Sequence, residues 1–142
     1  MRLAVASTVV LVLGAAAPAN AVSETAEGFS RAMQGCWNRV DTNDDASHQM
    51  CLDGGLTGTL TVMECQTHDD LTECSSQEGR YEFRDEKFWR SYADGPLAGG
   101  LDNCDVRLEA GKQVELHNCQ WTTEPALGAS ADDAVYERAF GQ

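Results

Sequence analysis

Six cysteines that all follow an export-type N-terminal segment are the feature that most constrains how this chain folds. Residues 1–21 combine a basic start at Arg2, a run of apolar and small residues from Leu3 to Ala17, and the small-residue sequence Ala19-Asn20-Ala21, which is the layout of a cleaved signal peptide. The apolar run is shorter than the roughly 20 residues that a membrane-spanning helix needs. We therefore expect a signal peptide at residues 1–21, one domain at residues 22–142, no membrane span, and a periplasmic or secreted location.

In an oxidising compartment, an even number of cysteines favours disulfide bonds over free thiols. The chain contains no Cys-x-x-Cys pair and no cysteine and histidine cluster with zinc spacing. Structural bridges are therefore predicted in preference to a metal or redox centre, and no metal or cofactor is expected. We predict three bridges and no free thiol, formed by Cys36, Cys51, Cys65, Cys74, Cys104 and Cys119.

The spacing of the cysteines indicates which of them are paired. Residues that face one another across a hairpin with an even-length loop are separated by an odd number, and cysteines taken two at a time along the chain satisfy this rule. Turn-forming residues lie near the middle of each interval. The turns are expected at Asn43-Asp44, Asp69-Asp70 and Gly111-Lys112, with Cys36 bonded to Cys51, Cys65 to Cys74 and Cys104 to Cys119.

The third pairing conflicts with the apolar pattern, whereas the first is supported because the same register sets Trp37 opposite Met50. Cys104 shares a strand face with Leu108, but Cys119 lies on the face opposite to Leu116. Successive residues of a strand point to opposite faces. The strand pairing that the disulfide requires therefore differs by one residue from the pairing that would place all the apolar side chains on one face. Either a β-bulge reconciles them or Cys104 pairs elsewhere, and the sequence leaves both open.

The mature chain reads as one short helix followed by strands. Residues 23–34 have a helical pattern that Gly35 ends. From residue 36 to 122, strand-like segments recur every 8–12 residues, and residues 81–89 suggest a hairpin with Phe83 facing Phe88. Residues 131–140 fit a strand or a helix, and we favour a strand. The predicted fold class is all-β: a small antiparallel barrel or sandwich with a short N-terminal helix, stapled by disulfides.

The sequence Gly35-Cys36-Trp37, at the start of the first strand and directly after a short helix, resembles the G-x-W opening of the calycin-like barrels. These are the lipocalins, the avidins and the small bacterial metalloprotease inhibitors. The resemblance implies that a late-strand arginine packs on the tryptophan, and Arg138 is the candidate. It also implies that the segment before the tryptophan, residues 22–30, is comparable to the tail that those inhibitors present to the enzyme's cleft. The lipocalin T-D-Y motif is absent, and three disulfides exceed the usual number in these families.

Charge and motifs exclude several classes of function. A net charge of −13 with ten Lys plus Arg provides no basic stripe for nucleic acid or anionic lipid. Residues 41–45 imitate the start of a calcium loop, but Ala46 and Leu52 replace the required glycine and glutamate, so an acidic turn is expected. Residues 53–59 are glycine-rich but precede a strand, so turn glycines explain them.

No sequence pattern selects a catalytic group. The histidines, His48, His68 and His117, show no regular ligand spacing. Exposed aromatics beside an arginine are typical binding anchors, so the candidate binding residues are Trp89, Arg90 and Tyr92, with core and rim packing as the alternative. We expect a non-enzymatic binding protein, inhibitor-like and with a protein partner. The alternatives are a lipocalin-like carrier of a small apolar ligand and a small periplasmic hydrolase with an unrecognised site.

Overall fold

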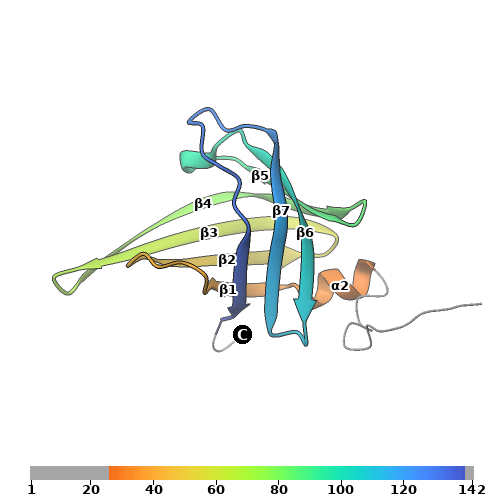
Figure 1. The fold of residues 1–142 in the computed structure, drawn as a ribbon, viewed down its shortest axis with the longest axis horizontal. Coiled ribbons are helices and arrows are strands. Elements are labelled where there is room, and N and C mark those ends of the chain that lie inside the picture. Colours follow the sequence, from red (N-terminus) through yellow and green to blue (C-terminus); the bar gives the residue numbers. More distant parts are fainter. Residues whose placement is uncertain (1–25, 140–142) are drawn as a thin grey trace, which may run out of the picture.

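The computed structural model describes residues 26–139, and the predicted signal peptide at residues 1–21 lies outside them. Eight antiparallel strands follow one another in chain order and close into a barrel, with the last strand pairing with the first (Figure 1). The all-β prediction is confirmed, and the choice between barrel and sandwich is settled as a barrel. The elements are α2 (Ala26–Ala32), β1 (Gly35–Arg39), β2 (Ser47–Gly54), β3 (Thr57–His68), β4 (Leu71–Arg84), β5 (Lys87–Tyr92), the 3₁₀ turn η4 (Gly95–Leu97), β6 (Leu101–Glu109), β7 (Gln113–Thr123) and β8 (Ala134–Arg138).

Several local predictions are confirmed by the register of the strands. Trp37 pairs with Met50 between β1 and β2, and Phe83 pairs with Phe88 across the β4–β5 hairpin. The ambiguous C-terminal segment is strand β8. The helix is shorter than the predicted residues 23–34: it covers Ala26–Ala32, and residues 23–25 lie outside the described residues. Among the described residues, no helix combines the length and apolar character that crossing a membrane requires.

The first two bridges form as the spacing predicted, the third pair, which the sequence left open, is also Cys104 with Cys119, and no cysteine is free. The conflict at the third pair is resolved by a β-bulge in the β6–β7 pairing, where the register shifts between Asn103 and Asp105. Asn118 has a positive φ of 53° at this point. The extra residue reverses the alternation of β7, so Cys119 packs against the barrel core like Leu116, and there it meets the buried Cys104.

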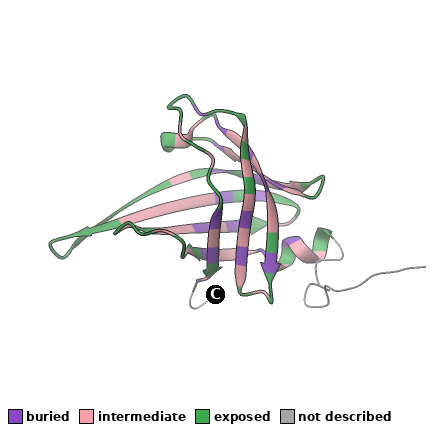
Figure 2. Ribbon diagram, in the orientation of Figure 1, coloured by how far each residue is buried: buried purple, intermediate pink, exposed green. Residues whose placement is uncertain are grey.

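The buried apolar side chains form one cluster, the core of the barrel, and Figure 2 shows how the buried residues are distributed along the strands. Buried and more exposed residues alternate along β5 and along the first part of β6, as expected where one face of each strand points inward. The largest fully buried side chains are Trp37, Phe88, Met33, Met50, Leu60 and Leu116. The core therefore lies inside the barrel.

The α2 end of the barrel is closed by the contact that the calycin resemblance implied. The Arg138 guanidinium lies 4.1 Å from the centre of the Trp37 ring. It also donates hydrogen bonds to the carbonyl oxygens of Ala32 and Gln34, at 2.6 and 2.8 Å. Gly35 has a φ of 101°, a conformation that glycine adopts without strain and that turns the chain from helix to strand. The fold is thus compatible with a calycin-like barrel.

Candidate functional site

The three predicted binding residues on β5 do not form one surface. Arg90 and Tyr92 are only 7% and 6% exposed and belong to the barrel interior. Trp89 points to the outside, where the Arg84 guanidinium lies 3.8 Å from its ring centre. This separation follows from the two-residue period of a strand. Trp89 alone is on the side that a partner can reach.

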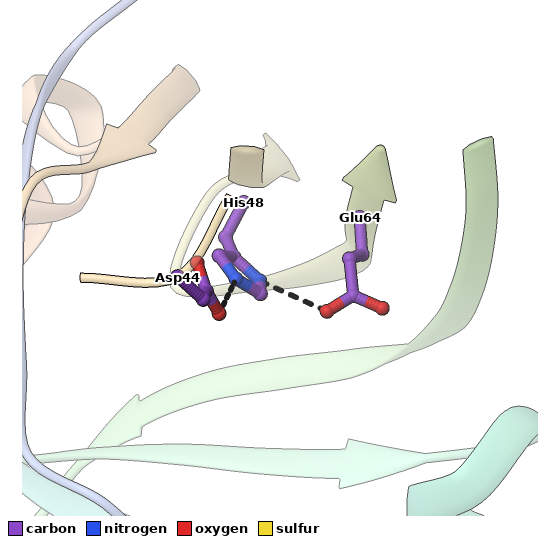
Figure 3. Close-up of side chains that lie close together, drawn as sticks. All are labelled: Asp44, His48 and Glu64. Carbon is purple, nitrogen blue, oxygen red and sulfur yellow. Dashed lines mark hydrogen bonds and ion pairs between the residues drawn. The ribbon is translucent and has the colours of Figure 1, made fainter. Parts of the chain in front are cut away.

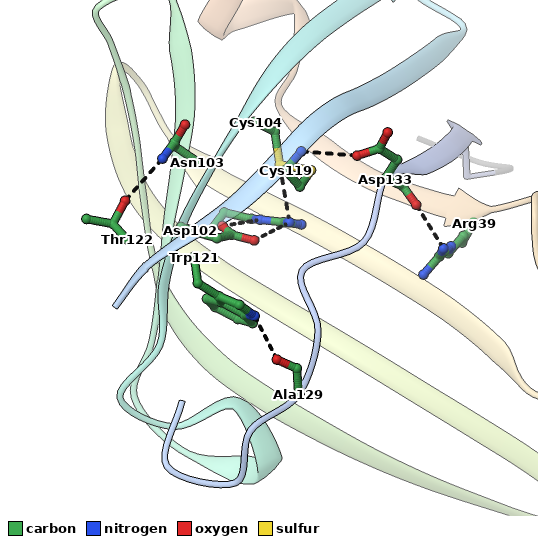
Figure 4. Close-up of polar contacts among 10 residues, drawn as sticks. Arg39, Asp102, Asn103, Cys104, Cys119, Trp121, Thr122, Ala129 and Asp133 are labelled. Atoms are coloured by element: carbon green, nitrogen blue, oxygen red, sulfur yellow. Dashed lines mark hydrogen bonds and ion pairs between the residues drawn. A yellow bond between two sulfur atoms is a disulfide. The ribbon is translucent and has the colours of Figure 1, made fainter. Parts of the chain in front are cut away.

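Arg90 forms a buried ion pair with Asp102 on the neighbouring strand β6. Its Nε and Nη2 atoms donate to the two carboxylate oxygens at 3.0 and 2.7 Å, and Nη2 also lies 3.5 Å from the Cys104 sulfur. Figure 4 shows Asp102 beside the Cys104–Cys119 bridge. Two parallel hydrogen bonds are the geometry in which a buried pair offsets the cost of its desolvation. Both charges are thus engaged within the chain.

Burial raises the pKa of Tyr92 to about 12, with Asp102 adding to the effect and Arg90 opposing it. For Arg90 itself, burial alone would lower the pKa, but the nearby Tyr92 and Asp102 raise it. The guanidinium is therefore charged and the phenol neutral at ordinary pH. A catalytic acid or base needs a pKa near the working pH, so this buried cluster has the properties of a structural group.

A second cluster, Asp44, His48 and Glu64, lies where the β1–β2 loop meets β2 and β3 (Figure 3). The imidazole lies between the two carboxylates: Nε2 is 3.0 Å from Asp44 and Nδ1 is 3.6 Å from Glu64. The hydrogen bond from His48 holds the pKa of the Asp44 carboxyl below its usual value, with Thr42 contributing a second bond. One ring nitrogen and one oxygen of each carboxylate lie within 4.8 Å of one another, a spacing that could hold a metal ion. Both ring nitrogens of His48 thus face carboxylate oxygens.

The other two histidines and the two motif-like segments have ordinary surroundings. His68 is exposed beside Gln66, and His117 lies 2.9 Å from Glu115. In the acidic segment 41–45, Asp41 forms an ion pair with Arg39 at 2.7 Å. The glycine-rich segment 53–59 is the β2–β3 hairpin.

Glycines of that hairpin make room for a core side chain. A Cβ atom at Gly58 would lie 2.9 Å from the Tyr81 ring, and the Tyr81 hydroxyl donates to the Gly55 carbonyl oxygen at 2.8 Å. The Gln34 side chain accepts a hydrogen bond from the Gly54 amide at 2.8 Å and donates to the Tyr81 hydroxyl at 2.9 Å. The glycines thus serve the packing of the α2 end of the barrel.

A surface concavity of about 510 Å³ lies at that end, between α2 and the β4–β5 turn. Its volume falls in the usual range for ligand pockets, but such pockets are lined mostly by apolar side chains. Here half of the lining residues are charged, and none belongs to the fully buried core. The concavity is lined by Ala26, Phe29, Phe83, Arg84, Asp85, Glu86, Lys87 and Val106.

Sequence reasoning did not foresee that the end of the β3–β4 hairpin projects from the barrel. All residues from 66 to 76 are exposed, and in Figure 1 this hairpin reaches well beyond the rest of the barrel. The predicted Cys65–Cys74 bridge lies in it. A signal was present: from residue 64 to 76 only the two cysteines and Leu71 are apolar, so this stretch cannot form part of a core.

The chain matches no protein family model, no curated protein and no solved structure.

Proposed function

We propose that the protein is an exported, non-enzymatic binding module that recognises a protein partner through its outer surface and acts as an inhibitor-like protein. The observation that carries this proposal is the filled interior. A carrier of the lipocalin type needs an empty apolar cavity, whereas here Trp37, Phe88 and Met50 are completely buried inside the barrel. The three disulfides support export to an oxidising compartment, where such bridges persist.

The buried ion pair argues in the same direction. A ligand that entered the barrel would have to displace or desolvate Arg90 and Asp102, which are tied to each other by two hydrogen bonds. Leaving either charge buried without its partner costs about 3–5 kcal/mol. Recognition at the outer surface avoids that cost.

The α2 end of the barrel is the surface on which we place the inhibitor-like contact. Ala26 and Phe29 at the start of α2 line the concavity, and Phe29 packs edge-on against Phe83 with ring centres 5.5 Å apart. In the metalloprotease inhibitors that the sequence resembles, the segment before the conserved tryptophan enters the enzyme's cleft. Residues 22–30 are the comparable segment of this chain.

The test is inhibition of secreted zinc metalloproteases by the mature chain, residues 22–142, measured as the rate of peptide hydrolysis. We expect a stoichiometric decrease in rate that is lost when the chain is shortened to begin at Ala26. A secreted serine protease, which has no catalytic zinc, is the control for non-specific effects. Unchanged hydrolysis by every metalloprotease would refute the inhibitor-like assignment. Stoichiometric binding of an apolar fluorophore in place of inhibition would favour the carrier.

A further inference from the structure

The end of the β3–β4 hairpin is built as an independent ribbon. We call residues 64–76 the arm. From residue 66 to the turn and back to residue 76, every side chain is exposed (Figure 2), so the arm has no core to hold it. A bare two-stranded hairpin is only marginally stable in water. Its shape must therefore be fixed by local features.

Two such features are present. Asp69 and Asp70 have φ values of 50° and 67°, the left-handed conformations of the two-residue turn whose twist matches that of the strands. Cys65 and Cys74, paired directly across the strands, are joined by a disulfide. The backbone of the arm is thus ordered before it meets a partner, which lowers the entropic cost of binding.

The arm presents an open edge. His68 and Leu71 flank the two-residue turn and form the hydrogen-bonded pair that closes it, and hydrogen-bonded and non-hydrogen-bonded pairs alternate from there along the ribbon. Every second residue of β4 therefore directs its N–H and C=O groups away from β3. In the arm these residues are Thr72, Cys74 and Ser76.

The same alternation is visible where β4 enters the barrel. Strand β5 pairs with β4 only as far as Tyr92 opposite Gly79. One residue further along, the outward groups of Glu78 are still engaged: its N–H donates to the Asp94 carboxylate and its carbonyl oxygen accepts from the Ala93 N–H, both at 2.8 Å. Beyond Glu78, no strand within residues 26–139 covers this edge.

The charge of the arm limits what can pair with that edge. The arm contains four carboxylates and no lysine or arginine. A second copy of the arm would bring like charges together, which is one way in which proteins protect edge strands from self-association. A segment with positive side chains would instead be attracted, and Leu71, 61% exposed, offers an apolar contact. The carboxylates belong to Glu64, Asp69, Asp70 and Glu73.

We propose that the outer edge of β4 in the arm, residues 71–76, is a docking surface for an extended, lysine- or arginine-bearing segment of a partner protein. The segment adds as a further strand, so that its backbone supplies hydrogen bonds and its basic side chains face the carboxylates. The arm points away from the end of the barrel that holds α2 (Figure 1). This docking surface is therefore independent of the protease inhibition proposed above.

The probe is a short capped peptide of alternating lysine and valine, with the corresponding glutamate and valine peptide as charge control. Binding is followed by NMR titration and by amide hydrogen exchange of the disulfide-intact protein. We expect slower exchange at the Thr72, Cys74 and Ser76 amides on addition of the lysine peptide, and no effect of the glutamate peptide. Failure of the lysine peptide to bind, or equal binding of both peptides, would overturn the proposal.

A matched pair of proline variants locates the edge. Thr67 and Thr72 face each other and share a hydrogen bond between their hydroxyl groups at 2.9 Å. T67P and T72P therefore lose the same side-chain contact but block opposite edges. T72P should weaken binding about tenfold and T67P by less than about twofold. Equal losses in the two variants would overturn the edge assignment.

A charge variant tests the same edge without altering the backbone, in case a proline variant does not fold. Glu73→Gln combined with Asp70→Asn removes two of the carboxylates and leaves the edge groups in place. We expect weaker binding of the lysine peptide and a smaller dependence of its affinity on salt. Unchanged affinity would refute the role of charge in selecting the partner. Because no protease is present in these measurements, their outcome does not depend on the inhibition assay.

Discussion

Replacing Trp37 with alanine should remove a large share of the stability of the fold. The side chain is completely buried, its Nε1 donates to the Met33 carbonyl oxygen at 2.9 Å, and the Arg138 guanidinium covers one face of the ring. Truncating a buried tryptophan costs about 3–5 kcal/mol. For a domain of this size we expect a decrease in melting temperature of about 12–20 °C.

Two further variants separate the contributions. Trp37→Phe keeps an aromatic face for Arg138 but leaves the Met33 carbonyl oxygen without its donor, which costs about 1–3 kcal/mol. Trp89→Ala is the matched control, because this tryptophan lies outside the barrel beside Arg84, and it should cost less than about 1 kcal/mol. The measurement is chemical denaturation with all disulfides intact. A loss at Trp37→Ala no larger than that at Trp89→Ala would refute the assignment of Trp37 as the anchor of the α2 end.

Three further predictions follow from the interior and the arm. Arg90→Ala leaves Asp102 buried without its partner, so denaturation should show a loss of about 3–5 kcal/mol. The pKa of Tyr92 is raised from its ordinary value near 10 to about 12, so the neutral phenol stabilises the folded state below pH 10, and this stabilisation is lost as the pH rises towards about 12. The ultraviolet absorbance of the phenolate should therefore appear only near that higher pH or when the protein unfolds. Replacing both Cys65 and Cys74 with serine should speed amide exchange in the arm and lower the free energy of unfolding by about 2–3 kcal/mol, because the bridge closes a short loop in the unfolded chain.

Much of the fold could be predicted because strand geometry imposes simple arithmetic on the sequence. Odd separations between cysteines identify residues that face each other across a hairpin, and the first two bridges follow from this rule alone. The third pair shows how a conflict in that arithmetic carries information. The alternation of β7 placed Cys119 on the wrong face, and the bulge at Asn118 is the single extra residue that the conflict required.

The binding residues were harder to place because a buried charge depends on a partner that is distant in the sequence. The position of Arg90 between Trp89 and Tyr92 suggested a surface binding residue. Phe88, Arg90 and Tyr92, however, occupy the same face of β5, and Phe88 and Tyr92 both belong to the core. That alternation indicated an inward-facing arginine. What the sequence did not show is that Asp102, on another strand, is placed to accept its hydrogen bonds.

The arm exists because β3 and β4 are longer than the closed barrel requires. β3 and β4 have 12 and 14 residues, whereas β1 and β8 have 5 each. The pairing that closes the barrel uses β3 only as far as Cys65 and β4 only from Gly79, so a shorter hairpin would close it equally well. The remaining residues bury no apolar surface and expose backbone groups that elsewhere in the barrel are paired. A segment that adds no apolar surface to the core and yet has its own disulfide has the construction that the proposed docking surface requires, because a fixed backbone lowers the entropic cost of binding.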